Sequence, residues 1–430
     1  MKFNRILIIL LAGATLLGSG SLNAGGTNYY SLYGARTLSL NGLYIAGTDG
    51  LNSAFSNPAS LSYLTGSSLR LTVADLLEQQ EFNSTKNGVF NSYRNDNFNL
   101  GGGIYWNFAP GITAALAYQP FVNYEVDWPY TVFSTRDSNA VILAFDMTNR
   151  LNISSISPSV GMSFGMLSLG LSANIYRVSQ FLAFPLQNNR PHGLAGYQVE
   201  YDENAWAYGF TLGAMADFSE NLRLGLMIRS SFKANMKGNA KSNMFAALDS
   251  AATDVNVASK LEMPWVMGLG AVYKISQSVS LNVDMSYSLW GSTQKTNNFT
   301  VENSKWQNGL NQTDSLLGVS PASFPLNLRN SLSAGIGFEV SGSEVMSYRF
   351  GYRFSQTPNT AESYNILSPG VSQHWFSFGI GYKDESYTVD AAIAYSIGMS
   401  REINNGAFSP TSGKYSSNNI VPAVSINYAF

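Results

Sequence analysis

The chain contains no cysteine among its 430 residues. Disulfide bonds, thiolate metal sites, a cysteine nucleophile and a cysteine-linked lipid anchor are therefore excluded. Histidine is almost as scarce, because only His192 and His374 occur and they lie far apart in the sequence. A zinc site with several histidine ligands is not expected, and the sequence indicates neither a metal nor a cofactor.

Charge is the next scarcity. Charged residues make up 12% of the chain, whereas about a quarter is usual in a soluble domain. The formal net charge is −2, so nothing indicates a nucleic-acid partner. Aromatic residues are abundant instead, with 24 tyrosines and 25 phenylalanines. Few charges and many aromatic rings fit a surface that faces lipid between two aromatic girdles.

Long apolar runs are missing from the body of the chain. After the N-terminus, no segment holds the roughly 18 to 20 apolar residues that a membrane-spanning helix needs. The first 24 residues are typical of a secretory signal, with Lys2 and Arg5, an apolar stretch over 6–17 and a cleavage site at Leu22-Asn23-Ala24. The alternative is an N-terminal membrane anchor, which the short apolar stretch disfavours. Any later membrane crossing must be made by strands.

Alternation is the strongest pattern present. Between Val279 and Leu289 every second residue is apolar, and serine, asparagine or aspartate stands between them. Residues 331–340 repeat the pattern, because every second residue from Leu332 to Val340 is apolar. A period of two indicates strands with one lipid face and one watery face.

The whole chain from residue 67 follows this pattern. We expect strands over 67–77, 97–108, 111–119, 156–164, 167–178, 205–217, 222–233, 264–274, 279–289, 331–340, 345–354, 375–383, 387–397 and 420–430. Short and long connections alternate, which predicts an all-β fold: a transmembrane antiparallel barrel of about 14 strands, with short turns in the periplasm and long loops outside. A soluble β-sandwich is the alternative, but it has no reason to alternate its loop lengths.

Residues 25–66 do not alternate. A barrel of this strand number encloses a wide lumen, so we expect this segment to plug it, the alternative being a periplasmic tail. The predicted organisation is a signal peptide over 1–24, an N-terminal hatch over 25–66 and an outer-membrane barrel over 67–430.

Several motifs resemble one family. Ser56-Asn57-Pro58-Ala59-Ser60-Leu61 is similar to the Asn-Pro-Ala hatch signature of the FadL-type outer-membrane transporters of long-chain fatty acids and aromatic hydrocarbons. Three further stretches also resemble the family, in the same order along the chain: Leu261-Glu262-Met263-Pro264, the stretch from Tyr348 to Pro358, and His374-Trp375 before Gly379-Ile380-Gly381-Tyr382. Ser60 departs from the pattern, and residues 120–155 and 179–204 match weakly.

The resemblance implies passive uptake of hydrophobic molecules across the outer membrane of a Gram-negative-type bacterium. Outer loops would capture the ligand, which would pass the hatch towards a lateral gap in the wall. Some relatives act in secretion and share the signature, so a substrate-free barrel with a secretion or structural role is the alternative. An enzyme is not expected, since His374, the main candidate base, already belongs to the family motif.

A fatty acid needs a cation for its carboxylate. Strand parity predicts that Arg229 and Lys233 on 222–233, and Arg349 and Arg353 on 345–354, point into the lumen. Asp217, Asp284, Glu339 and Asp390 share the inward face. The alternative is therefore a salt-bridge network that braces the hatch.

The fatty-acid tail needs an apolar surface. Two expected outer loops supply apolar capture residues: Phe121, Trp128, Tyr130 and Phe133 in one, and Phe181, Leu182, Phe184 and Leu186 in the other. The alternative is that these side chains belong to the girdle or pack loop against loop. Tyr428 and the terminal Phe430 resemble the signal read by the barrel-assembly machinery, or are ordinary girdle residues in contact with outer-membrane lipid.

Overall fold

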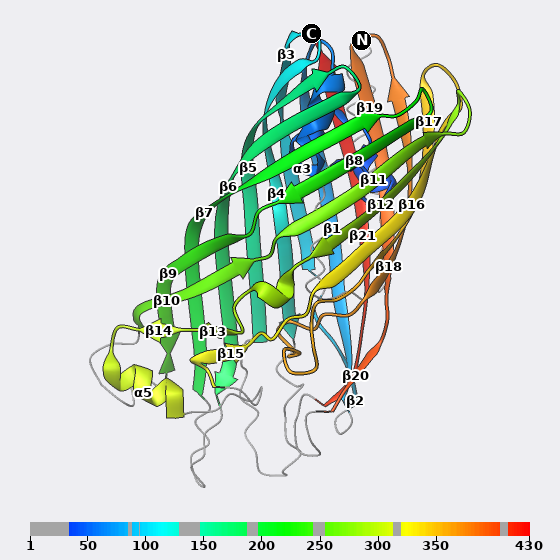
Figure 1. Cartoon of the computed structure of the whole chain (residues 1–430). Coiled ribbons are helices and arrows are strands. Elements are labelled where there is room, and N and C mark those ends of the chain that lie inside the picture. Colours follow the sequence, from blue (N-terminus) through cyan, green and yellow to red (C-terminus); the bar gives the residue numbers. More distant parts are fainter. Residues whose placement is uncertain are drawn as a thin grey trace, which may run out of the picture.

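Strands dominate the fold because alternating side chains give each one a face for lipid and a face for the lumen. The structure is a computed structural model that describes residues 34–84, 88–93, 95–128, 147–186, 197–243, 254–312, 320–404 and 412–430. The strands of the wall form one closed antiparallel sheet (Figure 1), and two short strands of the outer connections pair separately. Within these ranges, no helix combines the length and the apolar character needed to cross a membrane.

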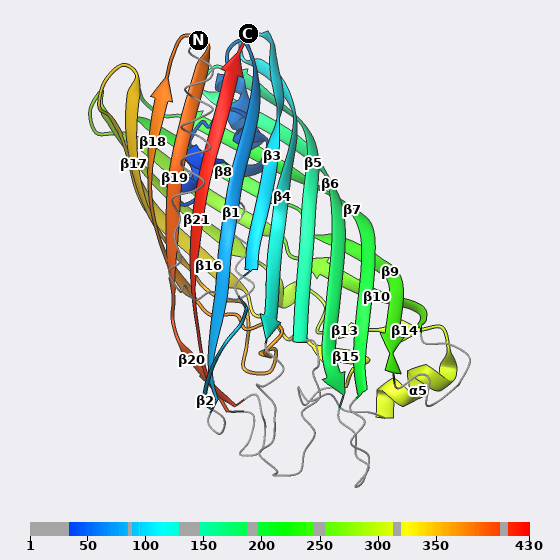
Figure 2. The ribbon, with the colours of Figure 1, turned by 180° about the vertical axis from the view of Figure 1, so that it is seen from behind.

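The wall consists of β1 (Ser67–Ser84), β3 (Asn95–Ala109), β4 (Ile112–Trp128), β5 (Met147–Phe164), β6 (Leu167–Leu186), β7 (Tyr197–Asp217), β8 (Leu222–Arg229), β9 (Phe232–Ser242), β10 (Asp254–Met263), β11 (Val266–Lys274), β12 (Val279–Ser288), β16 (Ser331–Ser341), β17 (Met346–Ser355), β18 (Gln373–Lys383), β19 (Tyr387–Gly398) and β21 (Gly413–Ala429). β9 continues the line of β8, and β10 that of β11. The wall therefore has fourteen strands, which confirms the prediction. β1 and β21 close it, side by side in Figure 2.

The two rims differ, as predicted. Tight turns connect the strands at one end, the inner rim, where the Phe430 N–H donates to the Ser67 carbonyl at 3.0 Å. Long connections at the outer rim carry the short elements. They are β2 (Gly88–Asn91), η4 (Trp290–Ser292), β13 (Thr296–Asn298), β14 (Thr300–Val301), α5 (Ser304–Gln312), β15 (Ser323–Pro325) and β20 (Arg401–Ile403).

Several wall strands reach further outward than the alternation indicated. β4 continues to Trp128, β6 to Leu186 and β21 begins at Gly413, each several residues beyond the expected bounds. Beyond the bilayer a strand has water instead of lipid on its outer face, so the contrast between the faces weakens. The sequence pattern therefore marks the membrane-crossing part of a strand and not its full length.

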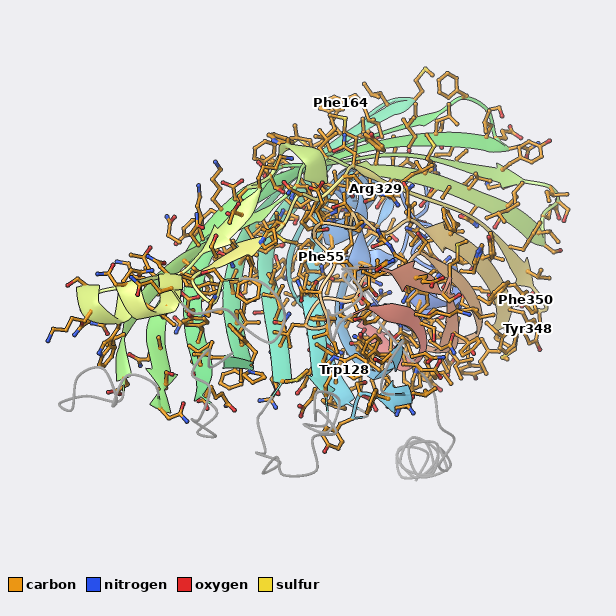
Figure 3. All side chains as sticks on the ribbon, turned by 90° about the horizontal axis from the view of Figure 1, so that it is seen from below. Phe55, Trp128, Phe164, Arg329, Tyr348 and Phe350 are labelled. Atoms are coloured by element: carbon orange, nitrogen blue, oxygen red, sulfur yellow. The ribbon has the colours of Figure 1, made fainter. Side chains whose placement is uncertain are left out.

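The outer surface of the wall carries apolar side chains. Leu69, Leu71 and Leu100 are about half exposed there, as expected for residues in contact with lipid. Figure 3 shows Phe164, Tyr348 and Phe350 projecting from the outside of the ring of strands, whereas Phe55 lies inside it.

Residues 34–63, called the hatch below, lie inside the lumen towards the inner rim (Figure 1). They form α2 (Ala35–Ser39), η1 (Gly50–Asn52), α3 (Ser53–Ser56) and η2 (Pro58–Tyr63). Glycines in the wall let the hatch backbone lie directly on the strands. A Cβ atom at Gly170 would sit 2.2 Å from the carbonyl carbon of Pro58, and one at Gly213 would sit 1.9 Å from Asn57 Oδ1. The predicted signal peptide lies outside the described residues.

The outer half of the lumen is filled differently. Buried apolar side chains from β1, β4–β7, β9, β10, β21 and the outer loops pack into one cluster, called the outer cluster below. Its largest fully buried members are Phe82, Trp128, Tyr176, Phe184, Tyr201, Phe299, Trp306 and Tyr415.

Candidate functional site

A cavity with a volume of about 190 Å³ lies between the hatch and the outer cluster. We call it the main cavity. Its walls come from both sides, and its lining includes Asn41, Gly42, Ile45 and Ser56 of the hatch and Phe121, Met227, Arg229, Ser230, Phe232, Met263, Pro264, Trp290, Ser333, Arg353, Gln356 and Trp375 of the barrel. Rings and aliphatic side chains alternate with hydroxyl and guanidinium groups. Such a mixture suits a mainly apolar molecule with one polar end.

Two predicted cations meet in this cavity. Arg229 Nη2 donates to the Phe55 carbonyl at 2.7 Å, and its guanidinium lies 5.1 Å from the centre of the Phe121 ring. Arg353 Nη2 donates to the Gly42 carbonyl, also at 2.7 Å. Both side chains are therefore held on backbone carbonyls of the hatch. A guanidinium carries several N–H donors, so each can also donate to the carboxylate of a ligand in the cavity.

Arg349 has another environment. Its Nε lies 3.0 Å from Glu339 Oε1 and its Nη1 lies 2.7 Å from Asp390 Oδ1, and the side chain is almost fully buried. Arg36 of the hatch reaches the same Glu339 carboxylate at 3.0 Å. Arg349 therefore belongs to a buried ion-pair network that ties α2 to the wall, the alternative left open by the sequence. It does not line the main cavity.

The prediction that Lys233 points into the lumen is wrong. Its side chain is 61% exposed on the outside, where Nζ lies 3.1 Å from Glu262 Oε1. The cause is the break between β8 and β9: Arg229 points inward, and Phe232 does so as well. The odd number of steps between them reverses the parity of every later residue in the strand.

The expected capture residues lie in strands and not in loops. Phe121 and Trp128 belong to β4, and Phe181, Leu182, Phe184 and Leu186 belong to β6. All except Phe181 are buried in the outer cluster. Phe181 is partly exposed beneath the guanidinium of Arg150, 5.6 Å away. Tyr130 and Phe133 lie outside the described residues.

The hatch signature has a direct structural role. Asn57 Nδ2 donates to the Ile45 carbonyl at 2.6 Å and lies 3.2 Å from the carbonyls of Ala214 and Leu226. Asn57 Oδ1 accepts from the Ala59 N–H at 3.1 Å and so caps η2, where Pro58 holds the first position. One amide side chain thus joins two hatch segments and two wall strands.

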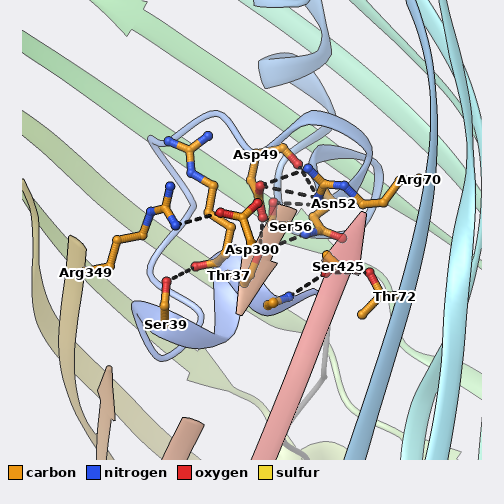
Figure 4. A network of polar contacts seen from close by, with 12 residues as sticks. Thr37, Ser39, Asp49, Asn52, Ser56, Arg70, Thr72, Arg349, Asp390 and Ser425 are labelled. Atoms are coloured by element: carbon orange, nitrogen blue, oxygen red, sulfur yellow. Dashed lines mark hydrogen bonds and ion pairs between the residues drawn. The ribbon is translucent and has the colours of Figure 1, made fainter. Parts of the chain in front are cut away.

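A second polar group, around Asp49, ties the middle of the hatch to β1 (Figure 4). Asp49 Oδ1 lies 3.2 Å from Arg70 Nη2 on β1, and Asp49 Oδ2 accepts from Asn52 at 2.6 Å and from the Thr37 hydroxyl. Burial by itself would raise the pKa of Asp49. The charges of Arg70 and Arg36 and the two hydrogen bonds outweigh burial and hold that pKa below its usual value.

The wall ladder is interrupted next to the hatch. β3 and β4 pair up to Gly102 and Tyr118, but outward of that point β3 pairs only with β1, and β4 only with β5. We call residues 95–101 and 119–128 the borders of the β3–β4 gap. Leu51, Asn52 and Phe55 of the hatch line a small cavity of about 10 Å³ at its inner end. A bulge at Pro120 to Val122 accompanies the interruption.

Sequence reasoning missed part of the cavity lining. Trp290 and Gln356 come from connections at the outer ends of strands, and Asn41 from the hatch. Trp290 directly follows an expected strand, which was the one available signal. His374 lies on the outer side of β18, where Nδ1 is 2.9 Å from the Tyr352 hydroxyl. In the described ranges, no group of three or more His, Asp or Glu side chains could hold a metal.

Tyr428 and Phe430 are more than half exposed at the inner rim, with ring centres 6.4 Å apart. This position suits a girdle residue, and the assembly-signal role stays a prediction.

The fold and the cavity define a class of protein: a fourteen-stranded membrane barrel, plugged by an N-terminal hatch, with an apolar cavity on the outer side of the plug. The chain belongs to the OMPP1/FadL/TodX family of outer membrane protein transport proteins, whose family model matches residues 35–430. The predicted family and the outer-membrane location are thereby confirmed.

Individual relatives are distant. The long-chain fatty acid transport protein of Escherichia coli K12 is 20% identical over 215 residues, which cover 48% of this chain and 45% of that protein. The crystal structure of a Pseudomonas aeruginosa FadL homologue superimposes with a TM-score of 0.74 at 15% identity, covering 96% of this chain and 100% of the other. The crystal structure of the Pseudomonas putida toluene transporter TodX superimposes with a TM-score of 0.72 at 16% identity, covering 93% of this chain and 98% of the other. These structural likenesses show the fold.

Proposed function

We propose that this protein is a passive outer-membrane channel for hydrophobic molecules that carry a carboxylate, with long-chain fatty acids as the substrate class. The observation that carries the proposal is the presence of Arg229 and Arg353 in one largely apolar cavity. Guanidinium groups form charge-assisted hydrogen bonds with carboxylates. A fatty-acid carboxylate between the two arginines would accept such bonds, and its chain would lie against the rings.

The proposed route follows the polarity of the lumen. The chain of the acid would first meet the outer cluster, whose apolar side chains replace the water around it. It would then settle in the main cavity with its carboxylate at the arginines. The β3–β4 gap is the proposed exit, because α3 lies between this gap and the main cavity. Ser56 of α3 lines the main cavity, and Phe55 of α3 lines the small cavity at the inner end of the gap.

The proposal is tested by comparing an acid with its uncharged analogue. We would measure binding of a long-chain fatty acid and of the alcohol of the same length to the purified protein and to Arg229→Gln and Arg353→Gln. A charge-assisted hydrogen bond contributes about 1.5–3 kcal/mol, so acid binding should weaken roughly tenfold to a hundredfold. Alcohol binding should stay unchanged. Arg223→Gln, whose partner is Asp217 at the inner rim, is the matched control.

Equal losses for acid and alcohol would refute the carboxylate assignment. Uptake of a labelled fatty acid by cells without a transporter of their own tests transport itself. An inserted barrel that binds neither ligand and supports no uptake would overturn the proposed function and favour the secretion or structural role.

A further inference from the structure

The wall contains a second interruption, on the other side of the main cavity. The ladder between β7 and its next neighbour runs from the inner rim to Thr211 and Arg229, then stops. It resumes with β9 only at Asn204 and Lys237. We call residues 205–210 of β7 and 230–236 opposite them the borders of the β7–β9 gap. On its other side β7 pairs with β6 without a break.

This interruption is larger than an ordinary bulge, which adds one residue to one strand. At its inner end Ser230 exchanges hydrogen bonds with Phe210: the Ser230 N–H donates to the Phe210 carbonyl, and the Ser230 hydroxyl accepts from the Phe210 N–H, both at 2.9 Å. Antiparallel strands direct alternate residues to the same neighbour. The backbone groups of Tyr208 and Trp206 therefore also face the gap, where the ladder supplies no pair.

The gap lies at the outer boundary of the lipid. Trp206, Tyr208 and Phe210 project outward from β7 and are 53%, 70% and 37% exposed, and Phe210 meets Trp265 edge-on at 5.9 Å. Lys233 projects outward from β9. Aromatic rings on one border and a lysine on the other are typical of the membrane–water interface. Unpaired backbone at this depth is tolerated where it lines a cavity or meets other protein groups.

Behind the gap stand three rings. Tyr176 and Phe232 stack at 4.1 Å, and Phe121 lies 5.3 Å from Tyr176. A Cβ at Gly209, on the β7 border, would lie 3.3 Å from Tyr176 Cε2. Phe121 and Phe232, in turn, line the main cavity. These three aromatic side chains therefore separate the β7–β9 gap from the main cavity.

We propose that the β7–β9 gap is a second lateral port, through which an acyl chain in the outer leaflet passes between β7 and β9 into the main cavity when the Phe121, Tyr176 and Phe232 rings move apart. The ligand class rests on the proposed function, whereas the opening itself does not. Small inward side chains on the borders, Ala207 and Ala234, leave room for a chain once the rings part. No hydrogen bond of the ladder has to break for this passage.

The opening is tested by chemical labelling, which the natural absence of cysteine makes unambiguous. Ala207→Cys places a thiol on the gap, and Ala394→Cys is the matched control. Both alanines face the lumen side and are at most 2% exposed, but Ala394 is paired with Ser377 and Val421 on its two sides. In lipid vesicles, a lipid-soluble maleimide should modify the first at least about tenfold faster, since local opening sets such rates. A saturating fatty acid should slow it. Equal rates would overturn the port.

The use of the port is tested by bridging it. In the Ala207→Cys/Ala234→Cys variant, a short bis-thiosulfonate bridge should slow fatty-acid uptake, and a reducing agent should restore it. The same bridge in Glu200→Cys/Lys241→Cys, a pair within the intact ladder, should have no effect. Full uptake through the bridged gap would refute its role as a route. If the unmodified protein takes up no fatty acid, the proposed function fails, while the labelling rates still decide whether the wall opens.

Discussion

The inner and outer halves of the lumen are both filled, but by opposite chemistry. The inner half holds the hatch through ion pairs, hydrogen bonds of side-chain amides and close contacts at wall glycines. Arg349, Asn57 and Gly170 are examples of each. The outer half is filled by aromatic and aliphatic side chains that make few directional bonds. Directional contacts define one position for a plug, whereas an apolar surface accepts many positions of a chain. The difference indicates that the inner half of the lumen closes the barrel, whereas the outer half is suited to binding an apolar chain.

The largest effect should come from the ion pairs of the inner half. Arg349→Met removes one partner of a buried network and leaves Glu339 and Asp390 undercompensated, which should cost about 3–5 kcal/mol. Arg223→Met is the control, because its pair with Asp217 is partly exposed and should contribute only about 0–1 kcal/mol. The temperature at which the folded barrel loses its compact gel mobility measures both. Equal shifts would contradict the distinction between the two pairs.

The glycine contacts should come next. In Gly170→Ala the new methyl group would meet the backbone of Pro58, so the hatch has to shift at a cost of about 1–3 kcal/mol. Gly268→Ala meets no backbone but the far ends of the Ile45 and Met227 side chains, which can turn away. Ion conductance in planar bilayers should rise in the first variant and not in the second. A closed Gly170→Ala channel would show that the hatch does not depend on this contact.

The outer half should respond through its rare directional bonds. Trp128 is almost fully buried, and its Nε1 donates to the Ile366 carbonyl at 2.8 Å. Trp128→Phe leaves that carbonyl without this donor, at a cost of about 1–3 kcal/mol. Trp106→Phe, on a tryptophan 37% exposed on the wall, should cost less than about 0.5 kcal/mol. Denaturant midpoints compare the two, and identical midpoints would argue against the bond as an anchor of the outer loops.

The smallest effect at neutral pH concerns Asp49. Its pKa in the folded protein is below the usual value of about 3.9, so its contribution to stability is complete above that pH and is lost as the pH falls through the lower folded value. Conductance should therefore stay low from pH 7 to about 5 and rise only in stronger acid. Asp49→Asn should lose this acid response. An unchanged acid response in that variant would assign it to another group.

The sequence predicted the parts of this fold that lipid imposes. Alternation marks a strand where one face meets lipid, so β12 and β16 were placed almost to the residue. Outside the bilayer the contrast disappears, and for that reason Trp128 and Phe184 were expected in loops. Arg353 and Arg349 could not be told apart either, because both point inward and only the three-dimensional position of Glu339 separates a cavity residue from a structural ion pair.

The positions of the interruptions in the wall could not be predicted for a related reason. Hydrogen-bond pairing depends on two strands, whereas periodicity reports on one. Pro120 and Pro264, which lack an N–H, stand beside the β3–β4 gap and the β8–β9 break. Neither proline indicates how many backbone pairs between the neighbouring strands are lost. Lys233 was assigned to the wrong face because of one such break.

The seam between β1 and β21 has a consequence for biogenesis. These strands are the first and the last of the wall, so the tube cannot close before β21 has been made. The hatch precedes β1 and yet bonds to the closing strand, since the Ala35 N–H donates to the Ser425 hydroxyl at 2.8 Å. This contact of the hatch can therefore form only when the tube itself can close. A chain that stops short of β21 leaves a slit beside β1 and lacks this contact, although its hatch keeps its bonds to the other strands.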